Sequence, residues 1–194
     1  VMKSARSIRE SLLKEALPAA GACPGQAQVK AAFDELSRGY DPQWGGFSKE
    51  PKFPMPSLLL FLFHYWKRFG EGAALSMARN TLSRIWSGGI HDHLGGGIAR
   101  YATDRRWVLP HFEKMLYDQA LLLHTVAEFH REKPDPLFVA FAEDLAGFVL
   151  REMTSPEGGF YSAFDADSEG EEGKYYLWTE EQIRSILSPE EAGV

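Results

Sequence analysis

The chain has 194 residues, of which 44% are hydrophobic, with a formal net charge of −6 and a pI near 5.5. These values fit one large globular domain or a piece of a longer protein, and the acidic balance argues against nucleic acid as a partner, since nucleic-acid binders normally have a basic face. The one cysteine, Cys23, excludes an internal disulfide and a CxxC redox site, so we expect a cytoplasmic location.

Helical periodicity covers most of the chain. Apolar residues recur at helical spacing over residues 3–17, where Pro18 and Gly21 end the pattern, and again over 26–38. Residues 57–68 are apolar nearly all round, which predicts a helix buried on several sides, yet the apolar run is too short to cross a membrane. Further helices are predicted at about 72–86, 112–131 and 136–152, and from the capping box that begins at Thr179.

Glycine-rich loops separate these helices and follow a loose repeat. Gly45-Gly46-Phe47, Gly88-Gly89-Ile90 and Gly158-Gly159-Phe160 each come after a helical segment and precede a polar, aromatic stretch. Such self-similarity is typical of stacked units, although each glycine pair could simply end a helix. Strand signals are limited to Ile98–Tyr101, Phe160–Ser162 and Lys174–Trp178, each short enough to be one arm of a β-hairpin. The sequence therefore predicts an all-α fold of antiparallel helical hairpins arranged in a ring, with long loops gathered at one end.

Four blocks of the sequence resemble a known family. GGFSKEPKFP, GGIHDHLGGGIARY, WVLPHFEKMLYDQALL and GGFYSAFDADSEGEEGKYYLWT, in this order over about residues 40–182, are similar to signature blocks of the YyaL-type, spermatogenesis-associated thioredoxin-domain proteins. The resemblance implies a partial (α/α)6 barrel, or toroid, similar to six-hairpin glycosidases and N-acylglucosamine 2-epimerases. It also implies that residues 1–194 are the first portion of that barrel, with a preceding thioredoxin-like domain and the remaining barrel outside this chain.

Candidate acid–base groups lie in the third and fourth blocks. His111 and Glu113 follow Pro110 at the expected start of a helix, and a histidine there can transfer protons near neutral pH, a role that the resemblance also implies. Asp165 and Asp167 are candidate carboxylate partners, as in glycosidase chemistry. The alternatives are helix caps for the first pair, and a solvated acidic loop or a loose calcium site for the second.

Two patterns resemble metal sites, but we predict neither a metal nor a cofactor. His91 and His93 could bind one ion at alternate positions, yet no third ligand is evident nearby. The acidic run from Asp165 begins like an EF-hand loop, but Tyr176 occupies the position of the closing acid.

Candidate substrate contacts lie in the same loops. Aromatic rings beside carboxylates suit the apolar faces of sugars, although several rings could instead fill the core. Asp118 lies on an apolar helix face, so it is either paired with Arg100 or Arg106 or shifted in its protonation. The predicted contacts are Trp44, Phe47, Asp92, Arg100, Tyr101, Trp107 and Asp118.

These features favour a carbohydrate-processing domain, either sugar isomerase or epimerase-like or glycoside hydrolase-like, that works by imidazole and carboxylate proton transfer. The alternative is a non-catalytic (α/α) scaffold that binds a saccharide or a protein beside the thioredoxin-like domain. Convergence of His111, Arg100 and the aspartates in one cleft favours the enzyme. Because half a ring would leave apolar faces such as Leu58–Leu62 uncovered, a homo-oligomer is also expected.

Overall fold

A computed structural model describes residues 2–16 and 23–193, and more than half of the chain is helical. The helices are α1 (Met2–Ala16), α2 (Gln26–Gly39), α3 (Pro56–Phe69), α4 (Gly72–Ser87), α5 (Leu116–Glu132), α6 (Pro136–Glu152) and α7 (Glu180–Ile186), with a 3-10 turn at Glu191–Gly193. Pro18 and Gly21, the expected helix stops, lie outside the described residues. Internal contacts divide the chain into two units between Asp34 and Glu35, and helices α3 to α7 with all the strands belong to the second unit.

Strands are confined, in the described ranges, to three antiparallel pairs of two residues each. They are β1 (Tyr101–Ala102) with β2 (Pro110–His111), β3 (Lys114–Met115) with β4 (Ala163–Phe164), and β5 (Asp167–Ser168) with β6 (Glu171–Glu172). The fold is therefore helical with short β-arms, as predicted. No helix in the part of the chain that the structure describes is long and apolar enough to cross a membrane.

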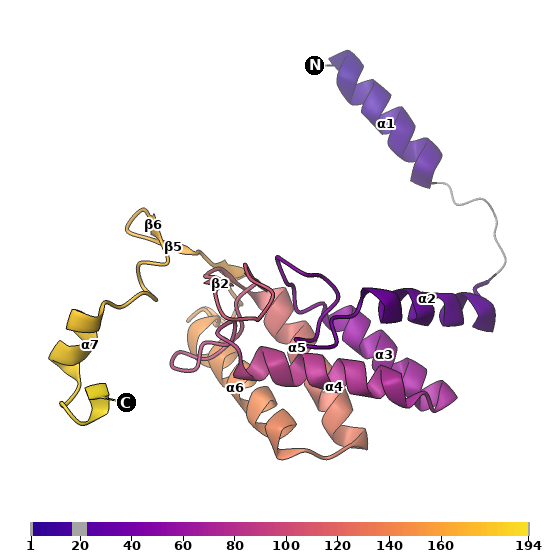
Figure 1. The fold of residues 1–194 in the computed structure, drawn as a ribbon. Coiled ribbons are helices and arrows are strands. Elements are labelled where there is room, and N and C mark those ends of the chain that lie inside the picture. The colour runs from indigo at the N-terminus through magenta and orange to yellow at the C-terminus, as the bar shows by residue number, and fades with distance from the viewer. Residues whose placement is uncertain (1, 17–22, 194) are drawn as a thin grey trace. The chain divides into compact units, whose positions relative to one another are not determined.

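Helices α3 to α6 form two antiparallel hairpins. Gly70 ends α3 with φ 71°, and Asp135 caps α6 by accepting a hydrogen bond from the Leu137 amide. Helices α3 and α5 run in the same direction, because Phe63 contacts Phe129 at 4.4 Å between ring centroids and Lys67, one turn later, pairs with Glu132. The long loops before α3 and α5 therefore lie at the same end of the helices (Figure 1).

The core lies between these four helices. Its fully buried side chains include Leu59, Leu62, Phe63, Leu82, Ile85, Leu122, Val126, Phe129, Phe141 and Leu145. Each contributes roughly 1.5–3 kcal/mol by its removal from water. The expectation that Leu58–Leu62 would be uncovered is wrong, since Leu59 and Leu62 have no exposed surface and the rest of that run is half-buried.

The start of the fifth helix differs from the prediction. Helix α5 begins at Leu116 rather than near residue 112, because the preceding backbone pairs with distant segments: His111 with Tyr101, and Lys114 with Phe164. Contrary to the prediction, His111 and Glu113 are therefore not at a helix N-terminus. Residues 174–178 form turns and irregular structure rather than the expected strand.

Buried charges fix the first long loop. The Lys52 ammonium has no exposed surface and lies 2.9 Å from Asp41 Oδ2, while Arg105 donates to both oxygens of that carboxylate at 2.6 and 3.0 Å. Arg105, and after it Lys52, holds the pKa of Asp41 well below its ordinary value, whereas burial lowers the pKa of Lys52. A buried ammonium needs this carboxylate, since an unpaired charge in the core is strongly unfavourable.

Asp41→Asn is expected to lower the free energy of unfolding by about 3–5 kcal/mol, because it leaves Lys52 buried without a counter-charge. Urea denaturation measures the loss. Glu180→Gln is the control, because it removes an exposed pair with Arg184 and should cost less than about 1 kcal/mol. Equal losses in the two variants would contradict a structural role for the Asp41 carboxylate.

Gly97 and Gly70 offer a matched test of loop packing. Both have positive φ, but a Cβ on Gly97 would lie 2.5 Å from Phe148 Cδ1, whereas a Cβ on Gly70 would meet nothing within 4 Å. Gly97→Ala should therefore be less stable than Gly70→Ala by about 1–3 kcal/mol, the usual cost of overpacking. Thermal unfolding compares them, and equal melting temperatures would show that the loop does not press on α6.

Candidate functional site

Four polar residues meet at the loop end of the helices, and we call them the His111 cluster: Arg100, His111, Glu113 and Asp118. The β1–β2 register places Tyr101 opposite His111, and their rings stack with centroids 4.8 Å apart and planes 13° apart. His111 Nε2 lies 3.9 Å from Glu113 Oε2, and the imidazole side chain is 25% exposed. The imidazole is thus held in one plane beside a carboxylate, yet it remains accessible.

Arg100 connects Glu113 to helix α5. Its Nη1 donates to Glu113 Oε2 at 2.9 Å, and its backbone amide donates to the Glu113 carbonyl. Asp118, in the first turn of α5, is 6% exposed, and burial raises its pKa to about 7, with Arg100 opposing the rise and Glu113 adding to it. Burial therefore favours the protonated form of Asp118 far more than in an exposed aspartate.

Two atoms of this cluster have unused hydrogen-bonding capacity. Among the described residues, Asp118 Oδ2 and Arg100 Nε are buried side-chain atoms without a hydrogen-bond partner. Buried polar groups are nearly always satisfied in folded proteins, so an unsatisfied acid next to an unsatisfied guanidinium nitrogen requires an explanation. Strongly shifted pKa values also cluster at functional sites. Together these features make the cluster a candidate acid–base site.

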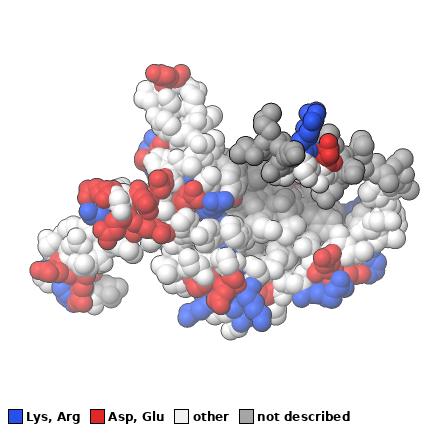
Figure 2. Space-filling view, turned by 90° about the horizontal axis from the view of Figure 1, so that it is seen from above, with Lys and Arg blue, Asp and Glu red and all other residues white. Residues whose placement is uncertain are grey.

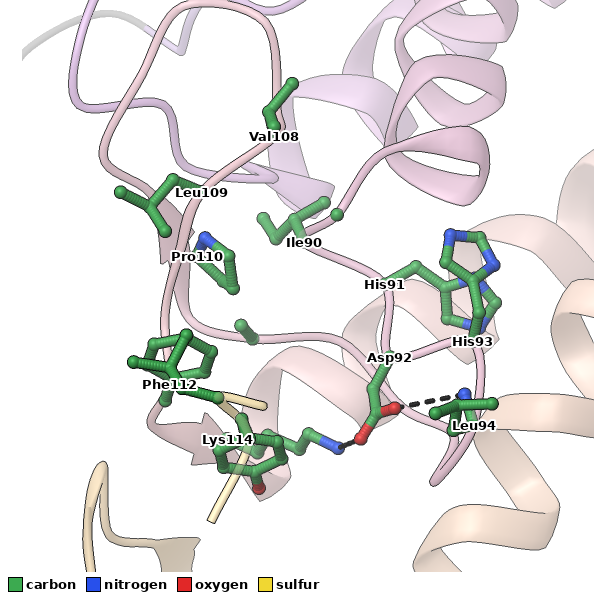
Figure 3. Close-up of a pocket in the computed structure, with 14 residues that line it drawn as sticks. Ile90, His91, Asp92, His93, Leu94, Val108, Leu109, Pro110, Phe112 and Lys114 are labelled. Carbon is green, nitrogen blue, oxygen red and sulfur yellow. Dashed lines mark hydrogen bonds and ion pairs between the residues drawn. The ribbon is translucent and has the colours of Figure 1, made fainter. Parts of the chain in front are cut away.

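A hollow of about 400 Å³ lies beside the second glycine-rich loop (Figure 3). Its walls are largely apolar, with Ile90 and Leu109 among them, but Asp92 and Lys114 also line it. Lys114 Nζ lies 2.7 Å from Asp92 Oδ2, donates to the Gly96 carbonyl, and lies 4.6 Å from the centroid of the Phe148 ring. Burial lowers the pKa of Lys114. These contacts of Lys114 hold the loop, and the Asp92 carboxylate is occupied by its ion pair with Lys114.

A second hollow, of about 490 Å³, contains the predicted aspartates. Asp165 and Asp167 line it together with Asp92, Lys114 and Glu152, among other residues. Both aspartates are exposed, and the Asp165 carboxylate accepts a hydrogen bond from the Asp167 amide. His111 and Arg100 line neither of these two hollows. The aspartates thus line a hollow that His111 and Arg100 do not line, although the β5–β6 register pairs Asp167 with Glu172, whose carboxylate contacts His111.

The aromatic residues predicted to contact a substrate lie in different environments. Trp107 is fully buried, and its indole Nε1 donates to the Trp44 carbonyl at 2.8 Å, so its ring is part of the core and inaccessible to a ligand. The half-buried Trp44 ring lies under the guanidinium groups of Arg84 and Arg106, at 5.2 and 5.0 Å. Phe47 packs on Tyr40. Tyr101 is the predicted aromatic residue that adjoins the His111 cluster.

The sequence did not indicate several residues that shape the candidate site and its loops. Lys52 and Lys114 lie in polar loops where a lysine is normally exposed, so no local pattern indicated their burial. Glu172 was counted within the acidic run, yet its Oε1 lies 2.7 Å from His111 Nδ1. His91 Nδ1 contacts the Trp86 carbonyl, and in the described part of the chain no group of three or more His, Cys, Asp and Glu suits a metal ion.

Asp118→Asn is expected to raise stability above about pH 7. The folded pKa of about 7 exceeds the ordinary 3.8, so the folded state binds more protons between these values and loses stability as the pH rises through them. The full cost, up to about 4 kcal/mol, is present above this window and absent below it. Asparagine has the same shape and no proton to lose. Melting temperatures between about pH 4 and 8 test this, and parallel curves for parent and variant would contradict the raised pKa.

No family model matches the chain. Spermatogenesis-associated protein 20 from Homo sapiens is 44% identical over 175 residues, which is 84% of this chain and 22% of that protein. An uncharacterised Caenorhabditis elegans protein, B0495.5, is 34% identical over 177 residues, 84% of this chain and 24% of its own length. The chain thus spans about a fifth of the length of the curated relatives it matches.

Solved structures with a similar fold include sugar epimerases and isomerases. Cellobiose 2-epimerase from Bacillus thermoamylovorans superposes with a TM-score of 0.61 at 15% identity, covering 73% of this chain and 42% of that one. A D-mannose isomerase gives a TM-score of 0.51 at 19% identity, over 64% of this chain and 32% of that one. The helical hairpins are therefore those of an (α/α)6 barrel. With this fold and the close sequence match, the chain belongs to the family of spermatogenesis-associated protein 20.

Proposed function

We propose that this part of the protein processes a carbohydrate by proton transfer, in the manner of a sugar isomerase or epimerase. One observation carries the proposal: a buried carboxyl, Asp118, with a pKa near 7 and an unpartnered oxygen, in one cluster with Arg100 and His111. The fold supports it, because the structural neighbours named above are sugar epimerases and isomerases. The substrate class is therefore a small sugar with a carbonyl group that is free or formed by ring opening.

The chemistry of such a reaction matches the cluster. Moving a proton on a carbon next to a carbonyl needs a base to take it, an acid to act at the oxygen, and a positive group to stabilise the negative charge that develops there. His111 Nε2 is the proposed base. Asp118 is the proposed acid, since burial raises its pKa to about 7 and so favours the protonated carboxyl. Arg100, with its unpartnered Nε, is proposed to stabilise the negative charge on the substrate oxygen. Tyr101 stacks on one face of the imidazole and holds its plane.

A binding-only function is the second candidate, and two observations favour it. Asp165 and Asp167 are exposed, and Trp107 is buried in the core. Exposed aspartates are poorly placed to act as a glycosidase acid and base, and a buried Trp107 cannot stack on a sugar. Both placements weaken the case for catalysis in the acidic loop. On this alternative the His111 cluster binds a saccharide or a protein without turnover.

Isotope exchange distinguishes the two candidates. The intact protein is incubated in D2O with aldoses, ketoses and cellobiose, and NMR follows the replacement of the C–H proton next to the carbonyl. We expect exchange with the parent, and a loss of about 100-fold or more in His111→Gln and Asp118→Asn, the usual contribution of one general acid or base. Glu143→Gln, an exposed change on α6, is the control.

Other outcomes have clear meanings. Sugar binding by the parent without any exchange would overturn the enzymatic proposal and leave the binding function. Exchange that survives in both cluster variants but is lost in Asp167→Asn would move the chemistry to the hollow beside the acidic hairpin.

A further inference from the structure

An acidic side chain from a distant hairpin contacts the proposed base. Glu172 lies on β6, 61 residues after His111, and its Oε1 is 2.7 Å from His111 Nδ1. The acidic side chains Asp165, Asp167, Glu169, Glu171 and Glu172 gather around this hairpin (Figure 2). Among them, Glu172 is the one whose carboxylate reaches the His111 cluster. Its side chain is 57% exposed, so the contact is not a consequence of core packing.

The residues next to this pair lock the two segments together. Phe112, which follows His111, stacks on Tyr176 with centroids 5.1 Å apart and planes 8° apart. Gly173, which follows Glu172, packs so closely on Phe112 that a Cβ would lie 2.6 Å from the ring. Two successive residues of one segment thus meet two successive residues of the other. This arrangement brings the Glu172 carboxylate to one nitrogen of the imidazole.

The contact decides which nitrogen of His111 carries the proton. A carboxylate accepts hydrogen bonds and cannot donate one, so Nδ1 must hold the hydrogen in the bond to Glu172. In the neutral imidazole Nε2 is then the unprotonated nitrogen, and Nε2 is the atom that lies 3.9 Å from Glu113. The hydrogen bond at one ring nitrogen commonly sets the tautomer in this way. Stacking on Tyr101 holds the plane of the ring, and the hydrogen bond to Glu172 selects the orientation within that plane.

We propose that Glu172 is a positioning residue that holds His111 in the Nδ1–H tautomer and so makes Nε2 the base. The inference deepens the proposed function and rests on it for its catalytic meaning. When Nε2 takes a proton from the substrate, the resulting imidazolium keeps its Nδ1–H bond to Glu172, and the negative charge of the carboxylate favours that state. The acidic hairpin therefore contributes to the reaction without touching the substrate.

NMR of the intact protein, with ¹⁵N-labelled histidine, reports the tautomer directly. At a pH where the imidazole is neutral, long-range ¹H–¹⁵N correlations should show His111 mainly as Nδ1–H in the parent. Glu172→Ala removes the acceptor, so the ratio of tautomers should shift at least several-fold toward Nε2–H. Glu172→Gln can either accept from Nδ1 through its carbonyl or donate to it through its amide, so its tautomer ratio should lie between those of the parent and Glu172→Ala. Glu171→Ala, the same change one position earlier, is the matched control and should leave His111 unchanged.

Kinetics add a second readout. If the parent shows isotope exchange, Glu172→Ala should lower kcat by about 10-fold or more with KM nearly constant, since the sugar does not contact Glu172. Glu172→Gln should recover part of that loss. An unchanged tautomer in Glu172→Ala, or an equal change in Glu171→Ala, would overturn the inference. A tautomer that depends on Glu172 in a protein without exchange would uphold the positioning role and overturn the proposed reaction.

Discussion

The structure depends on one constraint: the backbone of the long glycine-rich loops is buried beside the helices and must find hydrogen bonds there. Side chains from elsewhere in the fold supply many of them. Thr81 accepts from the Gly46 amide, Asp144 accepts from the Gly97 amide, Gln119 bonds both the amide and the carbonyl of Ile98, and Lys52 and Lys114 donate to the carbonyls of Gly45 and Gly96. The loops are therefore held by specific side-chain bonds in place of a regular sheet.

This arrangement prepares the candidate site before any ligand arrives. Gln119 and Lys114 anchor the loop segment that precedes α5. With this segment held in place, β2 pairs with β1 and β3 pairs with β4. Those pairs set the stacking of His111 on Tyr101 and bring the chain after α6 next to it. Acid–base groups carried on an anchored backbone keep their geometry, which is what proton transfer requires.

The same residue type has opposite properties at two positions. Asp41 is nearly buried, but two cations bond to it and hold its pKa well below the ordinary value. Asp118 has as little exposed surface, yet burial dominates over the influence of Arg100 and its pKa rises to about 7. The two direct cationic partners of Asp41 and the deeper surroundings of Asp118 together account for the difference. Asp41 therefore contributes to stability, whereas Asp118 keeps a proton available at the expense of stability.

The sequence by itself determined the helices and the order of the loops. Helical periodicity is a local property, so α2 to α4 and α6 agree with their predicted ranges to within a residue or two, and the Thr179 capping box is present. The match of the four sequence blocks also indicated the family and the barrel. Asp118, placed on one face with Leu122 and Phe129, is buried together with both of them.

Tertiary structure alone decided the rest. A two-residue strand such as β2 has no periodicity of its own and exists through its partner, which is why the start of α5 was misplaced. The burial of Lys52 and Trp107 depends on segments far away in the chain. The same holds for the acidic side chains: Asp165 and Asp167 line a hollow that His111 does not line, while Glu172 contacts His111. Hydrogen bonds and ion pairs act over a few ångströms of space, and sequence spacing does not record that distance.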